Sequence, residues 1–310
     1  MPPTSTVYDL DSPSLSVQVF LKQPVNVARA LTALTWQRYV ADKIFLRGSA
    51  ESVAGGTARY ERAETIFLDR AAAKRAPRAS FRRAGSDEDV RTAIAQEYGL
   101  EVPIPFRTIR RNQRDVLGRN LRKLANSIVD AVDDVAINLI LTDSDVQTTG
   151  ASADWSTGST DIIKDIAGAR KAIREQNQGY EADTLILNEA QALDIITDAD
   201  LRDAMPRESM VNPAMTGMIA PFMGFRQVLV TNTLTAGKVI VMDSRFGGTI
   251  ADEELDPIED YVAFSPGGEF RPIQTKVYKS QETDEIIVRG MRTPVMYLTD
   301  PKAIFVLTSA

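Results

Sequence analysis

The stretch "RNQRDVLGRNLRKLANSIVDAVDDVAINLILTD", from Arg111 to Asp143, contains no proline and predicts one long helix. Its apolar residues recur at steps of three and four and fall on one narrow stripe. At 1.5 Å per residue, a helix from residue 112 to 141 would be about 45 Å long. We therefore expect a long amphipathic rod, buried along one side. The predicted stripe consists of Leu117, Leu121, Leu124, Ile128, Val132, Val135 and Leu139.

The charges on this predicted helix run with basic residues first and aspartates last. That order opposes the helix dipole, which favours acids at the amino end and bases at the carboxyl end. Asp130, Asp133 and Asp134 share one face and could hold a metal ion or a shared proton, but without histidine we favour a solvated face. Because nothing local favours the charge order, we expect a contact outside the helix to do so. The predicted polar side consists of Arg119, Lys123, Asn126, Asp130, Asp133 and Asp134.

Histidine and cysteine are both absent from the 310 residues. Their absence removes disulfides, thiolate nucleophiles, zinc–sulfur sites and the most common general base. Carboxylate, lysine and tyrosine chemistry would remain available to an enzyme. The chain has no apolar run of about eighteen residues and its start lacks the features of a secretory signal. We therefore expect no membrane span, and a structural role is favoured over catalysis.

The charge is divided unevenly along the chain. Residues 1–125 hold 21 Lys and Arg against 13 Asp and Glu, whereas residues 126–310 hold 15 against 29. The net charge of −6 hides this division. Such asymmetry predicts either a surface for nucleic acid or complementary surfaces that meet between copies of the chain.

A basic run lies between residues 70 and 86, where no acid occurs. Residues 47–85 hold few large apolar side chains, so we expect a long two-stranded excursion that rests on a neighbour. The run could bind nucleic acid, but pairing with an acidic surface of another copy is at least as well supported. The basic run consists of Arg70, Lys74, Arg75, Arg78, Arg82 and Arg83.

Two further segments before the rod have recognisable patterns. Residues 1–30 are polar and rich in proline, which predicts an extended arm, and residues 28–45 predict a short helix. Residues 86–99 predict a helix that begins at a Ser86 cap, because three acids follow in its first turn. The arm and the excursion are both expected to lack a core of their own.

After the rod, the pattern alternates between helix and strand. We expect a Ser/Thr/Gly loop over 143–161, a helix over 161–176, and a buried strand entering a helix over 183–198. Two strands should surround a Thr-Leu-Thr-Ala-Gly turn, and three or four strands should fill 271–308. The second half of the chain therefore predicts an α/β unit followed by β-structure.

Two loops are candidates for ligands. In "DSDVQTTGASAD", Asp143, Asp145 and Gln147 have calcium-loop spacing. Thr148 stands where glycine is needed and Asp154 where glutamate is needed, so a connector is favoured. The loop "NPAMTGMIAPFMGF" lacks the Lys-Ser/Thr of a phosphate cradle and is either a folded loop or an apolar contact. We predict no catalytic, metal-binding or cofactor-binding residue and no cofactor.

The order of the parts carries a family resemblance. A rod ending in "DDVAINLIL" is followed by "LILNEAQALDIITD", by "FMGFRQVLVTN" and by a closing "RGMRTPVMYLTDPKAIFVLT". This chain resembles the major capsid proteins of tailed bacteriophages, whose fold is shared with herpesvirus capsid floors and encapsulin shells. The resemblance implies an α+β fold with an N-arm, an E-loop β-hairpin, a peripheral (P) domain with a spine helix and β-strands, and an α/β axial (A) domain. It places the N-arm and short helix at 1–45, the E-loop at 46–84, the P-domain at 85–155, the A-domain at 156–255 and the P-domain return strands at 256–310.

The resemblance also implies a function. A protein of this kind self-assembles as hexamers and pentamers into an icosahedral shell around double-stranded phage DNA. Its partners would be other copies of itself, a separate scaffolding protein, a portal, decoration proteins and DNA contacted non-specifically, without a membrane. It would lie in the virion capsid, and in the bacterial host cytoplasm during assembly. The expected subunit-interface residues are the basic run, Asp130, Asp133, Asp134, Met218 and Phe222.

Three alternatives remain at this point: an encapsulin-type nanocompartment shell, a carboxylate-dependent hydrolase and a nucleic-acid-binding regulator. Some relatives cross-link an E-loop lysine to an asparagine of the P-domain strands. Lys74 is available here, but no asparagine follows Asn232, so we expect no such cross-link.

Overall fold

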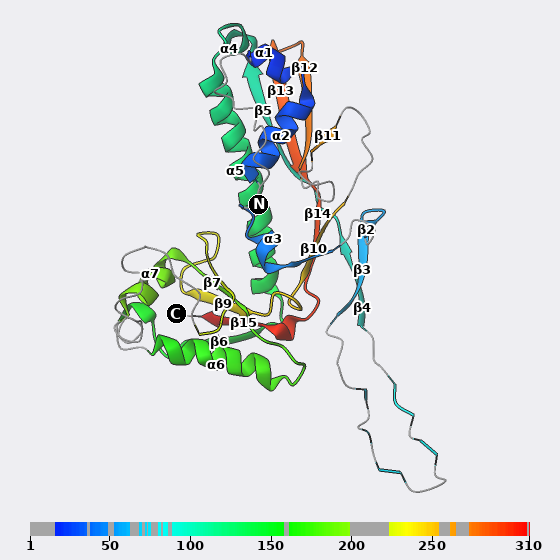
Figure 1. Ribbon diagram of the computed structural model, residues 1–310, viewed down its shortest axis with the longest axis vertical. Helices are drawn as coiled ribbons and strands as arrows, with labels where there is room; N and C mark the ends of the chain where they lie inside the picture. The colour runs from blue at the N-terminus through cyan, green and yellow to red at the C-terminus, as the bar shows by residue number, and fades with distance from the viewer. Residues whose placement is uncertain are drawn as a thin grey trace.

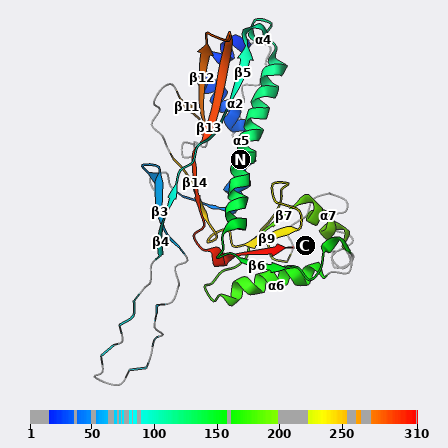
Figure 2. The same cartoon turned by 180° about the vertical axis from the view of Figure 1, so that it is seen from behind.

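The computed structural model shows an elongated chain with two lobes and a ribbon that projects to one side (Figure 1). A long helix runs through the upper lobe, and a five-stranded sheet flanked by helices forms the lower lobe. Seen from behind, the ribbon and the lower lobe lie on opposite sides of the long helix (Figure 2). The structure describes residues 16–35, 38–48, 53–62, 68–69, 72, 74–75, 80–81, 83–85, 89–157, 161–198, 223–253, 261–264, 273–308 and 310.

The predicted rod is confirmed as α5, Arg114–Thr142, a helix of 29 residues. The first five residues of the predicted stripe, from Leu117 to Val132, are buried. The prediction is wrong at Val135 and Leu139, which are only half-buried. In the last turns α3 and the lower sheet pack against a different side of the helix, so the buried residues there are Ala136, Ile137 and Ile140.

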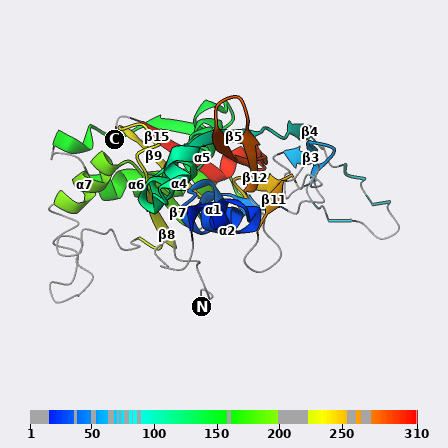
Figure 3. The same cartoon turned by 90° about the horizontal axis from the view of Figure 1, so that it is seen from above.

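The N-terminal segment is helical from residue 17, so the predicted extended arm is wrong for residues 17–30, and residues 1–15 lie outside the described part. The apolar side chains of this segment are buried against α5, which stabilises helix over an extended path. Seen from above, α1 and α2 lie side by side next to α5 (Figure 3). The helices are α1, Val17–Leu21; α2, Pro24–Thr35; and α3, Ala41–Ile44.

A four-stranded antiparallel sheet covers α5 in the upper lobe. Its order is β11-β12-β13-β5, and Gly290 of β13 lies where a Cβ would sit 3.2 Å from Ile128 and 3.4 Å from Leu124. A glycine there lets the sheet approach the helix closely. The strands are β5, Tyr98–Pro105; β11, Val262–Ala263; β12, Gln274–Ser280; and β13, Glu285–Arg292, and the short α4, Phe106–Arg110, precedes α5.

The projecting ribbon confirms a β excursion but extends it past the predicted end at residue 84. It contains β2, Val53–Ala54; β3, Thr57–Arg62; and β4, Asp89–Ile94. The helix predicted over 86–99 is therefore wrong. Two interactions outweigh the local helix signal: pairing with β3, and packing of Ala93 against the cluster of Val53, Ala58, Ala251 and Val295.

The lower sheet has the order β6-β15-β9-β7-β8. It confirms the predicted strand-to-helix segment, but the loop predicted over 143–161 contains β6. The last strand, β15, pairs with β9 and β6, so the predicted division at residue 256 does not separate the sheets. The elements are β6, Gln147–Gly150; β7, Thr184–Leu187; β8, Gln227–Val230; β9, Lys238–Met242; β15, Ile304–Thr308; α6, Ile162–Glu175; and α7, Glu189–Thr197.

A small three-stranded sheet joins the lobes and the ribbon. It contains β1, Leu46–Arg47; β10, Thr249–Asp252; and β14, Pro294–Tyr297, with β10 in the middle. Two 3-10 turns, Trp155–Thr157 and Pro301–Ala303, flank the lower lobe. None of the helices within the described residues is long and apolar enough to cross a membrane.

We expect Leu124→Ala to lower the free energy of unfolding by about 2 to 5 kcal/mol, because Leu124 is 2% exposed and its removal leaves a cavity under Gly290. Asp130→Asn, on the exposed side of the same helix, should change it by less than about 0.5 kcal/mol. Urea unfolding of the free subunit measures both. Equal effects of the two substitutions would contradict the assigned faces of α5.

Candidate functional site

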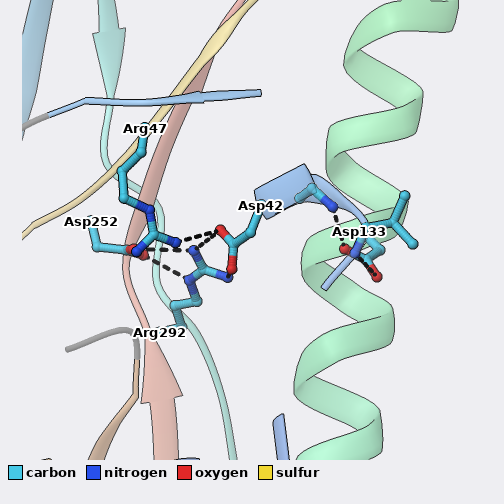
Figure 4. Close-up of polar contacts among 7 residues, drawn as sticks. Asp42, Arg47, Asp133, Asp252 and Arg292 are labelled. Atoms are coloured by element: carbon cyan, nitrogen blue, oxygen red, sulfur yellow. Dashed lines mark hydrogen bonds and ion pairs between the residues drawn. The ribbon is translucent and has the colours of Figure 1, made fainter. Parts of the chain in front are cut away.

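A buried arginine lies where the lobes and the ribbon meet (Figure 4). Arg292, at the end of β13, is 0% exposed and lies between two carboxylates. Its Nη2 donates to Asp42 Oδ1 of α3 at 2.7 Å. Its Nε and Nη2 donate to Asp252 of β10 at 2.7 and 3.0 Å. Arg47 reaches the same Asp42 at 3.3 Å. The hub, defined as Asp42, Asp252 and Arg292, thus joins three distant segments.

The charges of the hub depend on each other. Burial alone would lower the pKa of Arg292, but Asp252 and Asp42 hold it well above its ordinary value. Burial raises the pKa of Asp252, and Arg292 opposes that rise. The guanidinium also lies 4.3 Å from the centre of the Tyr39 ring, a cation–π contact. The arginine therefore stays charged inside the protein because both carboxylates and a ring surround it.

Asp133 does not lie on a solvated face with Asp130 and Asp134, as the sequence predicted. It is buried, and its two oxygens accept the backbone N–H groups of Val40 at 3.0 Å and Ala41 at 2.9 Å, where α3 begins. Figure 4 shows it reaching from α5 toward that backbone. Burial raises the pKa of Asp133 to about 6, although the two N–H donors act in the opposite direction. Its role in this chain is to fix α3, and with it the hub, to the long helix.

Asp130 and Asp134 are exposed, as predicted. The structure separates them from Asp133, so the three carboxylates do not form one site. Within the described residues, no group of three or more potential ligands could hold a metal ion.

The ribbon is anchored by a second buried arginine. Arg62, 8% exposed, contacts Asp143 at 2.5 Å and Asp145 at 2.8 Å. These are the acids of the predicted connector, and they hold the base of β3 against the carboxyl end of α5. The rings of Tyr60 and Tyr297 stack 4.2 Å apart and fix the same face.

The described members of the basic run are exposed. They are Lys74, Arg75 and Arg83, and the guanidinium of Arg75 lies 4.2 Å from the centre of the Phe81 ring. Arg70, Arg78, Arg82, Met218 and Phe222 lie outside the described residues. The structure therefore places three of the predicted interface cations on the surface beyond the ribbon.

Sequence reasoning missed the two buried arginines. The signal for Arg292 was a charged residue inside the alternating strand "EIIVRGMRTPV", where only a paired charge can be buried. Its partners at positions 42 and 252 could not be read from the sequence, because the pairing follows from how the sheets of β13 and β10 meet α3.

The comparisons with known proteins agree with this architecture. The model of the family described as phage capsid protein matches residues 88–307. The chain belongs to the phage capsid protein family. No curated protein matches the sequence.

Solved structures of similar fold extend the match over nearly the whole chain. A structure from Mycobacterium phage Che8 has a TM-score of 0.62 at 11% identity and covers 87% of this chain and 91% of its own. A virus-like particle from Pyrococcus furiosus has a TM-score of 0.58 at 14% identity, covering 91% and 98%. The capsid of an empty GTA particle has a TM-score of 0.57 at 16% identity, covering 89% and 89%. At these identities the likeness shows the fold, and the family match makes this a shell-forming capsid protein.

We expect Arg292→Met in this capsid protein to lower the free energy of unfolding by about 3 to 5 kcal/mol, because the half-buried Asp42 and Asp252 would lose Arg292 and, among the ion pairs of the described residues, only the contact of Asp42 with Arg47 would remain. The triple variant Asp42→Asn, Asp252→Asn, Arg292→Met removes all three charges and should recover much of that loss. Chemical denaturation of the free subunits compares the two. If the triple variant is destabilised by the sum of its single substitutions, the charges are not coupled.

Asp133 should make stability depend on pH. Its pKa is raised in the folded chain, so between about pH 4 and pH 6 the folded state binds more protons than the unfolded state. The free energy of unfolding of the native chain, relative to Asp133→Asn, should therefore rise as the pH falls through this window, by at most about 1.4 kcal/mol per pH unit. The control Asp130→Asn should keep the native pH profile. A constant difference between native chain and Asp133→Asn would contradict the raised pKa.

Proposed function

We propose that the chain assembles as hexamers and pentamers that close into an icosahedral shell around the double-stranded DNA of a tailed phage. The observation that carries the proposal is the bare outer face of the ribbon. Its two apolar residues, Val90 and Ile94, are 45% and 69% exposed, although they lie in a regular strand.

The two faces of the ribbon differ in what covers them. One face packs Ala58 and Tyr60 against β10 and β14 of the same subunit. On the other face Glu61 pairs with Val90 and Thr57 with Ile94, and all four side chains are exposed. A narrow sheet of this kind is marginal in water unless something covers it. In a shell, the neighbouring subunit supplies that cover.

The charge division supports contacts between unlike surfaces. The exposed cations Lys74, Arg75 and Arg83 lie beyond the ribbon, whereas the second half of the chain carries the excess of acids. Opposite charges on neighbouring subunits direct the orientation in which they meet. The basic run and the exposed Asp130 and Asp134 are the subunit-interface residues we propose, together with Met218 and Phe222 from the sequence pattern.

The parts of the fold take proposed roles in the shell. The segment 1–45 corresponds to the N-arm and its short helix, 46–84 to the E-loop, 85–155 to the P-domain with its spine helix, 156–255 to the A-domain and 256–310 to the P-domain return strands. Two strands cross these bounds, because β4 continues the E-loop and β15 joins the sheet of the A-domain. The proposed partners are a separate scaffolding protein, a portal, decoration proteins and non-specifically contacted DNA. Assembly would take place in the host cytoplasm before the protein resides in the virion.

We propose no catalytic role for the chain. The carboxylates with the most suggestive spacing have structural partners: Asp133 holds α3, and Asp143 and Asp145 hold Arg62. A hydrolase built on these groups would have to release them from those contacts.

An encapsulin-type nanocompartment is the second candidate. It is favoured by the likeness to the virus-like particle from Pyrococcus furiosus, which covers 98% of that chain. The genes next to this one distinguish the two: terminase and portal genes support a phage shell, and a cargo-enzyme gene supports a nanocompartment.

Electron microscopy of the purified protein should show closed shells. The variant Lys74→Glu, Arg75→Glu, Arg83→Glu should fold with an unchanged melting temperature, because these residues are exposed, but should form few shells at physiological salt. The control Lys74→Arg, Arg75→Lys, Arg83→Lys keeps the charges and should assemble. Normal shells from the reversed variant would show that the basic run is only solvated, and a native chain that forms no shells would sink the proposed function.

A further inference from the structure

The exposed side of α5 carries four charged side chains that form no ion pair with the described residues of the same subunit. Arg119, Lys123, Asp130 and Asp134 are all exposed. At 100° per residue they fall within about 60° of the helix circumference, so they form one row. Among the ion pairs of the described residues, none involves any of these four side chains.

This row runs against the helix dipole. Two cations lie in the first half of α5 and two carboxylates in the second half, the reverse of the order that the helix dipole favours at helix ends. Within the described part of the subunit, no ion pair compensates for it. A partner that presents carboxylates to the first half and cations to the second half would do so.

The row is complementary to itself when turned by 180°. Its centre lies between two polar residues, Asn126 and Ser127, which are exposed, and Asn126 Oδ1 accepts a hydrogen bond from Arg38 Nη1 of the same subunit. Arg119 precedes Asn126 by seven positions and Asp134 follows Ser127 by seven; Lys123 and Asp130 lie three positions away on either side. A two-fold axis through the centre therefore matches every charge with its opposite.

We infer that α5 of one subunit pairs antiparallel with α5 of a second copy through this row. Arg119 then faces the Asp134 position of the other copy, and Lys123 faces its Asp130 position. The contact is isologous, because the same row serves on both sides. It rests on the proposed assembly into shells and names the partner of the spine helix within it.

DNA fits the row less well as the occupant. Phosphates would be attracted to the first half but repelled by Asp130 and Asp134 about 11 to 17 Å further along the same row. A second copy of α5, placed antiparallel, presents carboxylates to the two cations of the row and cations to its two carboxylates. The pairs are exposed and therefore individually weak and sensitive to salt, so the contact gains its effect from repetition over the shell.

Charge exchange tests the pairing directly. The acidic-row variant, Arg119→Glu with Lys123→Glu, and the basic-row variant, Asp130→Lys with Asp134→Lys, should each fold yet lose most shells on electron micrographs. The fourfold variant that carries all four changes restores the complementarity, and its new charge order agrees with the helix dipole. It should assemble like the native chain, and a 1:1 mixture of the two double variants should yield more shells than either alone.

The outcomes separate this inference from the proposed function. A native chain without shells sinks the proposed function. Shells from the native chain together with normal shells from both double variants overturn only the pairing. A fourfold variant that melts like the native chain but fails to assemble also overturns it, because the four charges would then serve different partners.

The absence of cysteine allows a second readout. Ser127→Cys places a thiol next to the two-fold axis, so mild oxidation of shells should yield a cross-linked dimer on a non-reducing gel. Asn138→Cys is exposed on the same helix, but its copies would lie about 34 Å apart along the paired helices. It should remain monomeric. No dimer from Ser127→Cys in intact shells would overturn the register.

Discussion

Arg292 is fully buried, and both of its carboxylate partners come from other parts of the chain. Asp42 is 250 positions away and Asp252 is 40. An unpaired arginine could not remain there, so the hub forms only when α3, β10 and β13 meet in one arrangement. Asp133 then ties α3 to the spine helix, and β10 passes from the hub to the face that carries the ribbon. The orientation of both lobes and of the ribbon depends on this network.

The surfaces that we propose for assembly lie outside the buried core of the subunit. The ribbon has one face packed on β10 and β14 and one bare face, and Arg62 holds its base against the end of the spine helix. The first half of the exposed row on α5 similarly lies opposite the buried residues Leu117, Leu121, Leu124 and Ile128. Burial thus stabilises the subunit, while exposed apolar and charged groups remain for the contacts between copies that we propose. This separation suits a capsid protein, which must fold before it assembles.

The fold could be predicted from the sequence where a pattern was long and periodic. The spine helix, the strand entering α7 and the final β-strands were all identified, and the order of these parts indicated the capsid fold. Shorter segments were misread. Three acids over 87–89 suit a helix start, but pairing with β3 makes residues 89–94 a strand. Residues 17–30 looked too polar for a core, yet Phe20 and Val27 are buried against α5.

The sequence by itself determined the long helix, its charge order, the absence of cysteine and histidine chemistry, and the family. These depend on local periodicity and composition, which are properties of neighbouring residues. Only the tertiary structure decided which acids are buried. Asp130, Asp133 and Asp134 look equivalent on a helical wheel, but α3 covers Asp133 alone and uses it as an acceptor. The fate of a charged residue depends on what packs over it, and that is settled by contacts between segments far apart in the chain.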